Sequence, residues 1–128
     1  MIQGLGTAIY PVTDLVQAKA WYSQVLEVEP YFDQPFYVGF NVAGFELGLL
    51  PCGQPGGAAT QPGSAGVTAY WRVADAATEF ARLVDLGGTP HEKLQDVGEG
   101  IKVASVLDPF GNVFAILENP HFDVSKLR

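Results

Sequence analysis

Histidine and cysteine, which are typical of catalytic and transition-metal sites, are scarce in this 128-residue chain. The chain has two histidines, His91 and His121, and a single cysteine, Cys52. A transition-metal site takes three or four His, Cys or carboxylate ligands at about 2.0–2.3 Å from the ion. His91 follows a helical segment and His121 lies in the C-terminal stretch NPHFDVSKLR. For both, a surface position is favoured over metal ligation.

The sequence supports nucleophilic catalysis no better. Cys52 lies in a Gly- and Pro-rich segment with no His or Lys beside it, which favours an inert thiol over a nucleophile. The predicted strand pattern brings no Ser-His-Asp or Cys-His pairing together, and no Gly-rich phosphate loop follows a strand. The chemistry-bearing residues therefore favour binding over catalysis.

Charge and composition restrict the class of partner. Seven basic residues face fourteen acidic ones, for a formal charge of −7. Because phosphate binding needs a basic surface, we expect no nucleic-acid partner. The acidity mildly favours a cationic ligand, although acidity that only keeps a small protein soluble is the favoured interpretation.

The N-terminal stretch MIQGLGTAIYPV has no basic segment before its apolar residues, so we expect no signal peptide. No apolar run approaches the roughly 20 residues that a membrane helix needs. A single cysteine rules out an internal disulfide and agrees with a reducing compartment. We expect a cytoplasmic protein without a membrane partner.

An internal repeat organises the elements that must position any site. The segment TAIYPVTD (7–14) recurs as TAYWRVAD (68–75), with an offset of 61 residues. A helix is predicted after each copy, over Leu15–Leu26 and Ala76–Leu86, from apolar residues at helical spacing. Asp14 is placed to cap the first helix, with Gln17 at capping-box spacing.

Strands are predicted after each helix. Segments 36–42 and 45–51 are joined by Ala43-Gly44, a hairpin signal, while HEKLQDV, IKVASVLD and NVFAILE follow the second helix. Each half is thus β-α-β-β-β. We expect an α+β fold in which two modules form a curved mixed sheet, with helices on its convex face and a concave pocket. The single domain divides into module one (1–50), a flexible linker (51–66), module two (67–120) and a tail (121–128).

Alternation along the strands separates a core face from an open face. The core face is predicted to hold Ala8, Tyr10, Val12, Phe36, Val38, Phe40, Val42, Phe45, Leu47, Leu49, Phe114 and Ile116. The opposite face mixes aromatic, small and polar residues, a make-up typical of a small-molecule pocket. Aromatic strand residues are more often core than pocket, but the repeated placement of small residues favours a cavity.

The paired modules, the segment PVTDLVQAKAWYSQVLEVEP and the closing hairpin LDPFGNVFAILENP resemble the vicinal oxygen chelate superfamily. This superfamily includes glyoxalase I, extradiol dioxygenases, fosfomycin-resistance enzymes and bleomycin-resistance binding proteins. The resemblance implies that enzymatic members hold one divalent metal on the concave face. Their His, Glu or Gln ligands lie at the starts of the first and fifth strands and within the fourth and eighth.

The equivalent positions in this chain are Thr7, Gly48, Thr68 and Ala115. Neutral Thr is a poor metal ligand, and Gly and Ala offer no side-chain donor. Glu46 lies on the same face as Gly48 but could not hold a metal alone. The resemblance, joined to these residue types, implies a pocket without the Lewis acid that the enzymes use.

We therefore expect a metal-free small-molecule-binding homodimer, with no cofactor and no catalytic residue. It would sequester a cationic or aromatic ligand, as a drug- or toxin-resistance protein of the bleomycin-resistance type does. The expected ligand-binding residues are Thr7, Ile9, Tyr37, Asn41, Glu46, Gly48, Thr68, Tyr70, Arg72 and Ala115. Two alternatives stay open: a divergent metal-dependent lyase, isomerase or dioxygenase relative with displaced ligands, and a dimeric scaffold with a relic pocket.

Overall fold

Two modules with the same order of elements make up the structure, a computed structural model that describes residues 1–53 and 61–121. The N-terminal module comprises Leu5–Gly63 together with Phe110–Asn112. The C-terminal module comprises Met1–Gly4, Ser64–Pro109 and Val113–Arg128. Residues 54–60 of the predicted linker and 122–128 of the predicted tail lie outside the described residues.

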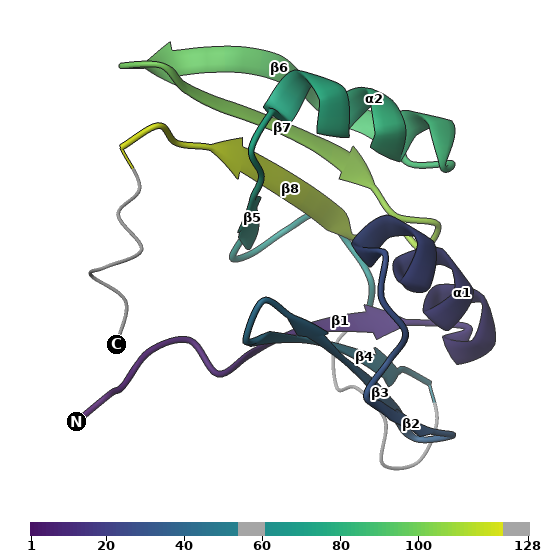
Figure 1. Cartoon of the computed structure of the whole chain (residues 1–128). Helices are drawn as coiled ribbons and strands as arrows, with labels where there is room; N and C mark the ends of the chain where they lie inside the picture. Colours follow the sequence, from purple (N-terminus) through teal and green to yellow (C-terminus); the bar gives the residue numbers. More distant parts are fainter. Residues whose placement is uncertain (54–60, 122–128) are drawn as a thin grey trace. The chain divides into compact units, whose positions relative to one another are not determined.

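The N-terminal module contains one helix and a four-stranded mixed sheet (Figure 1). The strand order is β1-β4-β3-β2, with β1 parallel to β4 and the other neighbours antiparallel. Its elements are β1 (Thr7–Val12), α1 (Leu15–Leu26), β2 (Phe32–Gln34), β3 (Tyr37–Val42) and β4 (Phe45–Pro51).

The C-terminal module repeats this topology with the order β5-β8-β7-β6, in which β5 is parallel to β8. Helix α2 lies across β6, β7 and β8 (Figure 1). The elements are β5 (Tyr70–Arg72), α2 (Ala76–Asp85), β6 (Thr89–Gly98), β7 (Ile101–Leu107) and β8 (Val113–Glu118). The predicted α+β class with two β-α-β-β-β modules is confirmed.

An aspartate caps the start of each helix. The carboxylates of Asp14 and Asp75 each accept a hydrogen bond of 3.0 Å, from the N–H groups of Gln17 and Thr78 respectively. These bonds satisfy donors that the first helical turn leaves without an intrahelical partner. Helix α1 has its predicted bounds, and α2 ends one residue earlier than predicted. Neither helix in the described part of the chain is long and apolar enough to cross a membrane.

The hairpin between β3 and β4 turns through Ala43 and Gly44, as predicted. Both residues have positive φ, 50° and 93°, the conformation of a two-residue type I′ turn. The turn is reinforced by the Gly44 N–H, which donates to the Asn41 side-chain oxygen at 2.8 Å. Because a two-residue turn sets the strand register, it places Asn41 opposite Glu46 and Gly39 opposite Gly48.

Each sheet buries the face on which its helix packs. In the N-terminal module the buried strand residues are Tyr10, Val12, Val38, Phe40, Leu47 and Leu49. In the C-terminal module they include Ala104, Val106, Phe114 and Ile116. Two core predictions are wrong, because Phe36 and Phe45 are exposed. Phe36 precedes β3 and Phe45 is the first residue of β4, so both lie at strand ends rather than in the covered middle of the sheet.

The helix cap at Asp75 predicts a pH dependence of stability. The Thr78 N–H that donates to this carboxylate lowers the pKa of Asp75 below its ordinary value. Desolvation raises this pKa by less than that hydrogen bond lowers it. The Thr78 hydroxyl, the Ala77 N–H and the charge of Lys102 also lower it. A lowered pKa stabilises the folded state above the unfolded-state value of about 3.9 and ceases to do so as the pH falls through the folded-state value. The difference in Tm between the parent protein and Asp75→Asn should therefore shrink between pH 7 and pH 3. A difference that stays constant over this range would contradict the cap.

Candidate functional site

The open face of the N-terminal sheet gathers polar and small residues from β1, β3 and β4. Strand pairing sets Glu46 between Thr7 and Asn41, and it sets Gly48 between Ile9 and Gly39. The neighbouring residues Leu47 and Leu49 point to the opposite, buried face. The sheet register thus brings the predicted open-face residues of this module onto one surface.

The centre of this surface is the carboxylate of Glu46, which binds three hydroxyl groups. The Thr7 hydroxyl donates to Oε2 at 3.1 Å, and the Tyr37 hydroxyl donates to the same oxygen. The Tyr31 hydroxyl donates to Oε1. We call these four side chains the Glu46 cluster. Its members come from β1, β3, β4 and the segment before β2, so several elements of the module hold one negative charge in place.

Two glycines make room for the tyrosine rings of the cluster. A Cβ atom at Gly48 would lie 2.7 Å from Tyr37 Cζ and closer still to the Tyr37 hydroxyl. A Cβ atom at Gly39, the residue paired with Gly48, would lie 3.3 Å from ring carbons of both Tyr31 and Tyr37. The Tyr37 side chain therefore fills the space into which any side chain at position 48 would project.

An aromatic group that the sequence reading missed adjoins the cluster. Phe32 pairs with Gly39 on the open face, and its ring centroid lies 6.1 Å from those of Phe36 and Tyr37. Tyr31 is also outside the predicted site, although its hydroxyl reaches Glu46. The signal available in the sequence was the density of aromatic residues in YFDQPFY (31–37), which spans β2 and ends at the first residue of β3.

The other predicted site residues of this module have different surroundings. Ile9 lies on the open face and is 49% exposed. Asn41 also faces this surface, but its side-chain oxygen accepts a hydrogen bond from the Gly44 N–H and so serves the hairpin turn.

The C-terminal module holds the remaining predicted residues. Tyr70, 46% exposed, pairs with the fully buried Ala115, and Arg72 pairs with Leu117. Thr68 precedes β5 and lies outside the strand in which it was predicted. Ser105, paired with Ala115 on the other side, was not predicted.

Ser105 is fully buried and is bound to the edge strand β6. Its hydroxyl donates to the Glu92 carboxylate at 3.2 Å and accepts the Glu92 N–H at 3.2 Å. A buried hydroxyl that makes both bonds is satisfied. Ala115 itself has no metal-binding side chain, and the hydroxyl of Ser105, the residue paired with it, is satisfied.

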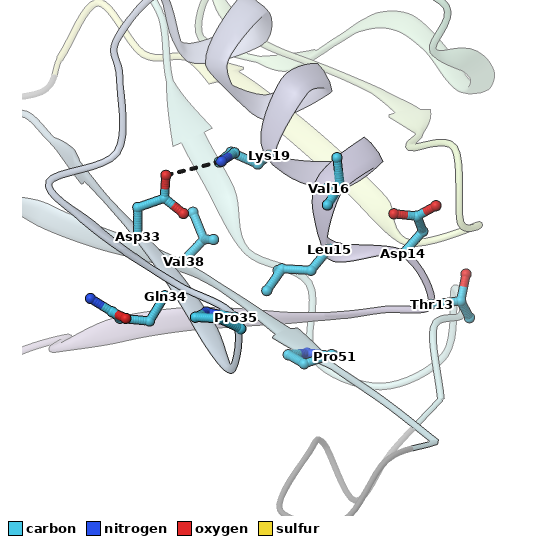
Figure 2. Close-up of a pocket in the computed structure, with 10 residues that line it drawn as sticks. All are labelled: Thr13, Asp14, Leu15, Val16, Lys19, Asp33, Gln34, Pro35, Val38 and Pro51. Atoms are coloured by element: carbon cyan, nitrogen blue, oxygen red, sulfur yellow. Dashed lines mark hydrogen bonds and ion pairs between the residues drawn. The ribbon is translucent and has the colours of Figure 1, made fainter.

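A cavity of about 600 Å³ lies on the helix side of the N-terminal sheet (Figure 2). Leu15 points into it from the first turn of α1, and Lys19 Nζ binds Asp33 Oδ2 at 2.9 Å across it. The lining residues are Thr13, Asp14, Leu15, Val16, Lys19, Asp33, Gln34, Pro35, Val38 and Pro51. Within this cavity Lys19 and Asp33 neutralise each other, and Asp14 caps α1. The cavity therefore offers volume to a ligand but few polar groups that converge on it. We therefore place the candidate site on the open face.

The family is identified by a match over residues 4–116 to the Glyoxalase/Bleomycin resistance protein/Dioxygenase superfamily. The chain belongs to this superfamily, in agreement with the resemblance stated from its sequence motifs. No curated protein matches the chain significantly.

Solved structures with the same fold are numerous and distant in sequence. A glyoxalase-related enzyme from Fulvimarina pelagi has 23% identity and a TM-score of 0.75, and the match covers 98% of this chain and 95% of that one. The fosfomycin resistance protein FosX from Listeria monocytogenes has 14% identity, a TM-score of 0.75 and coverages of 94% and 97%. TioX from Micromonospora sp. ML1 has 20% identity, a TM-score of 0.68 and coverages of 90% and 98%. At these identities the likeness establishes the fold.

The residues of this chain do not fit the divalent metal that the enzymatic members hold. At position 48 the Tyr37 ring fills the space of a ligand side chain, and Thr7 donates its proton to Glu46. Ala115 has no donor atom in its side chain. Over residues 1–53 and 61–121, no three His, Cys, Asp or Glu side chains gather in a way that could hold an ion. Glu46 alone is too few ligands for a metal.

The close approach of Tyr37 to Gly48 can be tested by a double-mutant cycle. Gly48→Ala should cost about 1–3 kcal/mol of unfolding free energy, because the new methyl group must displace the Tyr37 ring. In the Tyr37→Ala background the same substitution should cost much less, since the ring is gone. Urea denaturation measures both values, with Gly6→Ala as the control, because a Cβ atom there meets open space. Additive costs would show that Tyr37 does not occupy this position.

Proposed function

We propose that the protein is a metal-independent small-molecule-binding member of the superfamily, of the bleomycin-resistance type. The observation that supports this most is the position of Tyr37, whose side chain fills the space of a metal ligand and binds Glu46. A Lewis-acid site is thereby replaced by a fixed group of hydroxyls and one carboxylate. Such a group can orient a ligand, but it supplies no activated water or polarised carbonyl.

Exposed apolar surface in and beside the Glu46 cluster supports a binding role. Tyr31 is 63% exposed, Ile9 49% and Phe32 38%. Binding sites commonly combine apolar and aromatic walls with a few polar groups that set orientation. Covering these side chains would contribute roughly 25 cal/mol per Å² of apolar surface removed from water, and ring stacking would add to it.

In this proposal the C-terminal module has an aromatic binding surface of its own at Tyr70, with Thr68, Arg72 and Ala115 as the other predicted residues of that module. The role that follows is sequestration, in which one ligand is held without being changed. The homodimer and the cytoplasmic location stay predictions from the sequence. A lyase, isomerase or dioxygenase activity would need metal ligands other than the residues at positions 7, 48, 68 and 115.

Metal independence is tested on purified full-length protein. A thermal-shift screen with planar and cationic compounds should give stabilising ligands, and each shift should persist after dialysis against EDTA. Elemental analysis should find no stoichiometric metal. Stoichiometric nickel, zinc, iron or manganese, with ligand binding or turnover lost on chelation, would replace this proposal by the enzymatic alternative. A screen without any stabilising compound would favour the scaffold.

Tyr70 provides a second test of the binding surface. Tyr70→Ala should weaken a ligand found in the screen by about 1–3 kcal/mol, the range measured for bases stacked on aromatic side chains. Tyr70→Phe, which keeps the ring, should bind nearly as well as the parent. Calorimetry gives the affinities, and the unfolding midpoints show whether each variant is folded. Equal affinities for the alanine variant and the parent would remove Tyr70 from the site.

A further inference from the structure

The Glu46 cluster presents hydrogen-bond acceptors only. Thr7, Tyr31 and Tyr37 have one hydroxyl proton each. The Tyr31 and Tyr37 protons are directed at the Glu46 carboxylate, and the Thr7 proton is directed at Glu46 Oε2 or at the Glu46 main-chain oxygen, 3.1 and 3.3 Å away. These three hydroxyl groups can therefore act toward a ligand only as hydrogen-bond acceptors, through their oxygen lone pairs. A ligand that meets this surface must bring its own donors.

The carboxylate itself has room for one more donor. An ionised carboxylate has about four lone-pair sites, two on each oxygen. Thr7 and Tyr37 use at most the two sites on Oε2, because Thr7 also reaches the Glu46 main-chain oxygen, and Tyr31 uses one site on Oε1. One site on Oε1 stays available, and a charged donor would fill it with a shorter and stronger bond than a neutral one.

Within the N-terminal module, no described side chain neutralises Glu46 by an ion pair. Lys19, the lysine of this module, lies on α1 on the helix side of the sheet and pairs with Asp33 there. The formal charge of −7 attracts cations over a longer range. The cluster is thus an anionic group whose counter-charge must come from outside the described residues of this module.

The aromatic rings around the carboxylate add a second preference for positive charge. Phe32 lies 6.1 Å from Tyr37 and from Phe36, measured between ring centroids, and Tyr31 and Tyr37 both reach Glu46. The face of an aromatic ring carries negative electrostatic potential and attracts ammonium and guanidinium groups. The same rings offer apolar surface to the body of a ligand, and Phe36, like Tyr31, is 63% exposed.

We infer that the open face of the N-terminal module binds an organic cation, a protonated amine carried on an aromatic or other apolar body. This inference rests on the proposed binding function and names its ligand class. The ammonium N–H groups would donate to Glu46 Oε1 and to the hydroxyl oxygens of the cluster, while the body lies on Tyr31 and Phe32. A neutral ligand with acceptors only, or an anion, would meet no donor there.

Three probes of similar shape separate charge from shape: 2-phenylethylamine, 2-phenylethanol and 3-phenylpropanoate. Their affinities are measured by NMR titration of the ¹⁵N-labelled full chain, following the amides around Glu46 and Tyr31. The amine should bind about tenfold or more tightly than the alcohol, as a charge-assisted bond implies. The carboxylate probe should give no shift at these positions.

Variants show whether Glu46 is the group that selects the amine. Glu46→Gln should reduce amine affinity to that of the alcohol and leave the alcohol unchanged. Tyr31→Phe, which removes one acceptor and keeps the ring, should lower the preference for the amine by a smaller factor and serves as a second variant should Glu46→Gln not fold. Asp33→Asn is the matched control, because it removes a carboxylate on the opposite side of the same sheet and should leave the preference intact.

The outcomes distinguish this inference from the function on which it rests. Equal binding of the three probes at these amides, or a preference for the amine that survives Glu46→Gln, would overturn the organic-cation inference while small-molecule binding stands. No shift with the amine at millimolar concentration would overturn it as well. The proposed function would then be decided by the thermal-shift screen and the metal analysis.

Discussion

The features of the N-terminal open face depend on one pair of glycines. Gly39 and Gly48 face each other across β3 and β4, and neither has a side chain to fill the surface above them. The rings of Tyr31 and Tyr37 occupy that space, and from there their hydroxyls reach Glu46. A single side chain larger than hydrogen at position 48 would displace Tyr37. The polar cluster and the lack of room for a side chain at position 48 therefore have the same steric cause.

The two modules have the same strand register but carry different side chains at equivalent positions. Ile9 pairs with Gly48 in β1 and β4, and the residue 61 positions after Ile9, Tyr70, pairs with Ala115 in β5 and β8. The internal repeat thus extends to the pairing of individual residues. The smallest residues occupy equivalent places, yet one is covered by a tyrosine ring of the neighbouring strand and the other lies beside a buried serine. Common topology does not make the two open faces chemically alike.

Local signals explain which parts of this structure could be predicted from the sequence. The caps at Asp14 and Asp75 and the Ala43-Gly44 turn are decided within a few residues, and the predicted elements around them are confirmed. Strand β2 has only three residues, too few for alternation to show, so Phe32 was missed along with Tyr31. Predicting where the Tyr37 side chain lies requires knowing that Gly39 pairs with Gly48 and which way the Tyr37 ring points. A pattern of residue types in the sequence gives neither. The cavity beside α1 could not be predicted either, because its size depends on the distance between the β2–β3 hairpin and the helix.

The chemistry of the Glu46 cluster separates two kinds of cation. A divalent metal ion replaces its hydration shell with several strong ligands, and Mg²⁺ or Ca²⁺ takes six or more oxygens, usually with more than one carboxylate. One carboxylate and three neutral hydroxyls provide too little charge for that exchange. An ammonium or guanidinium group carries a single charge and directional N–H bonds, and it gains from aromatic faces as well as from oxygen acceptors. A surface with one anionic group, acceptor hydroxyls and exposed rings therefore favours organic cations over metal ions.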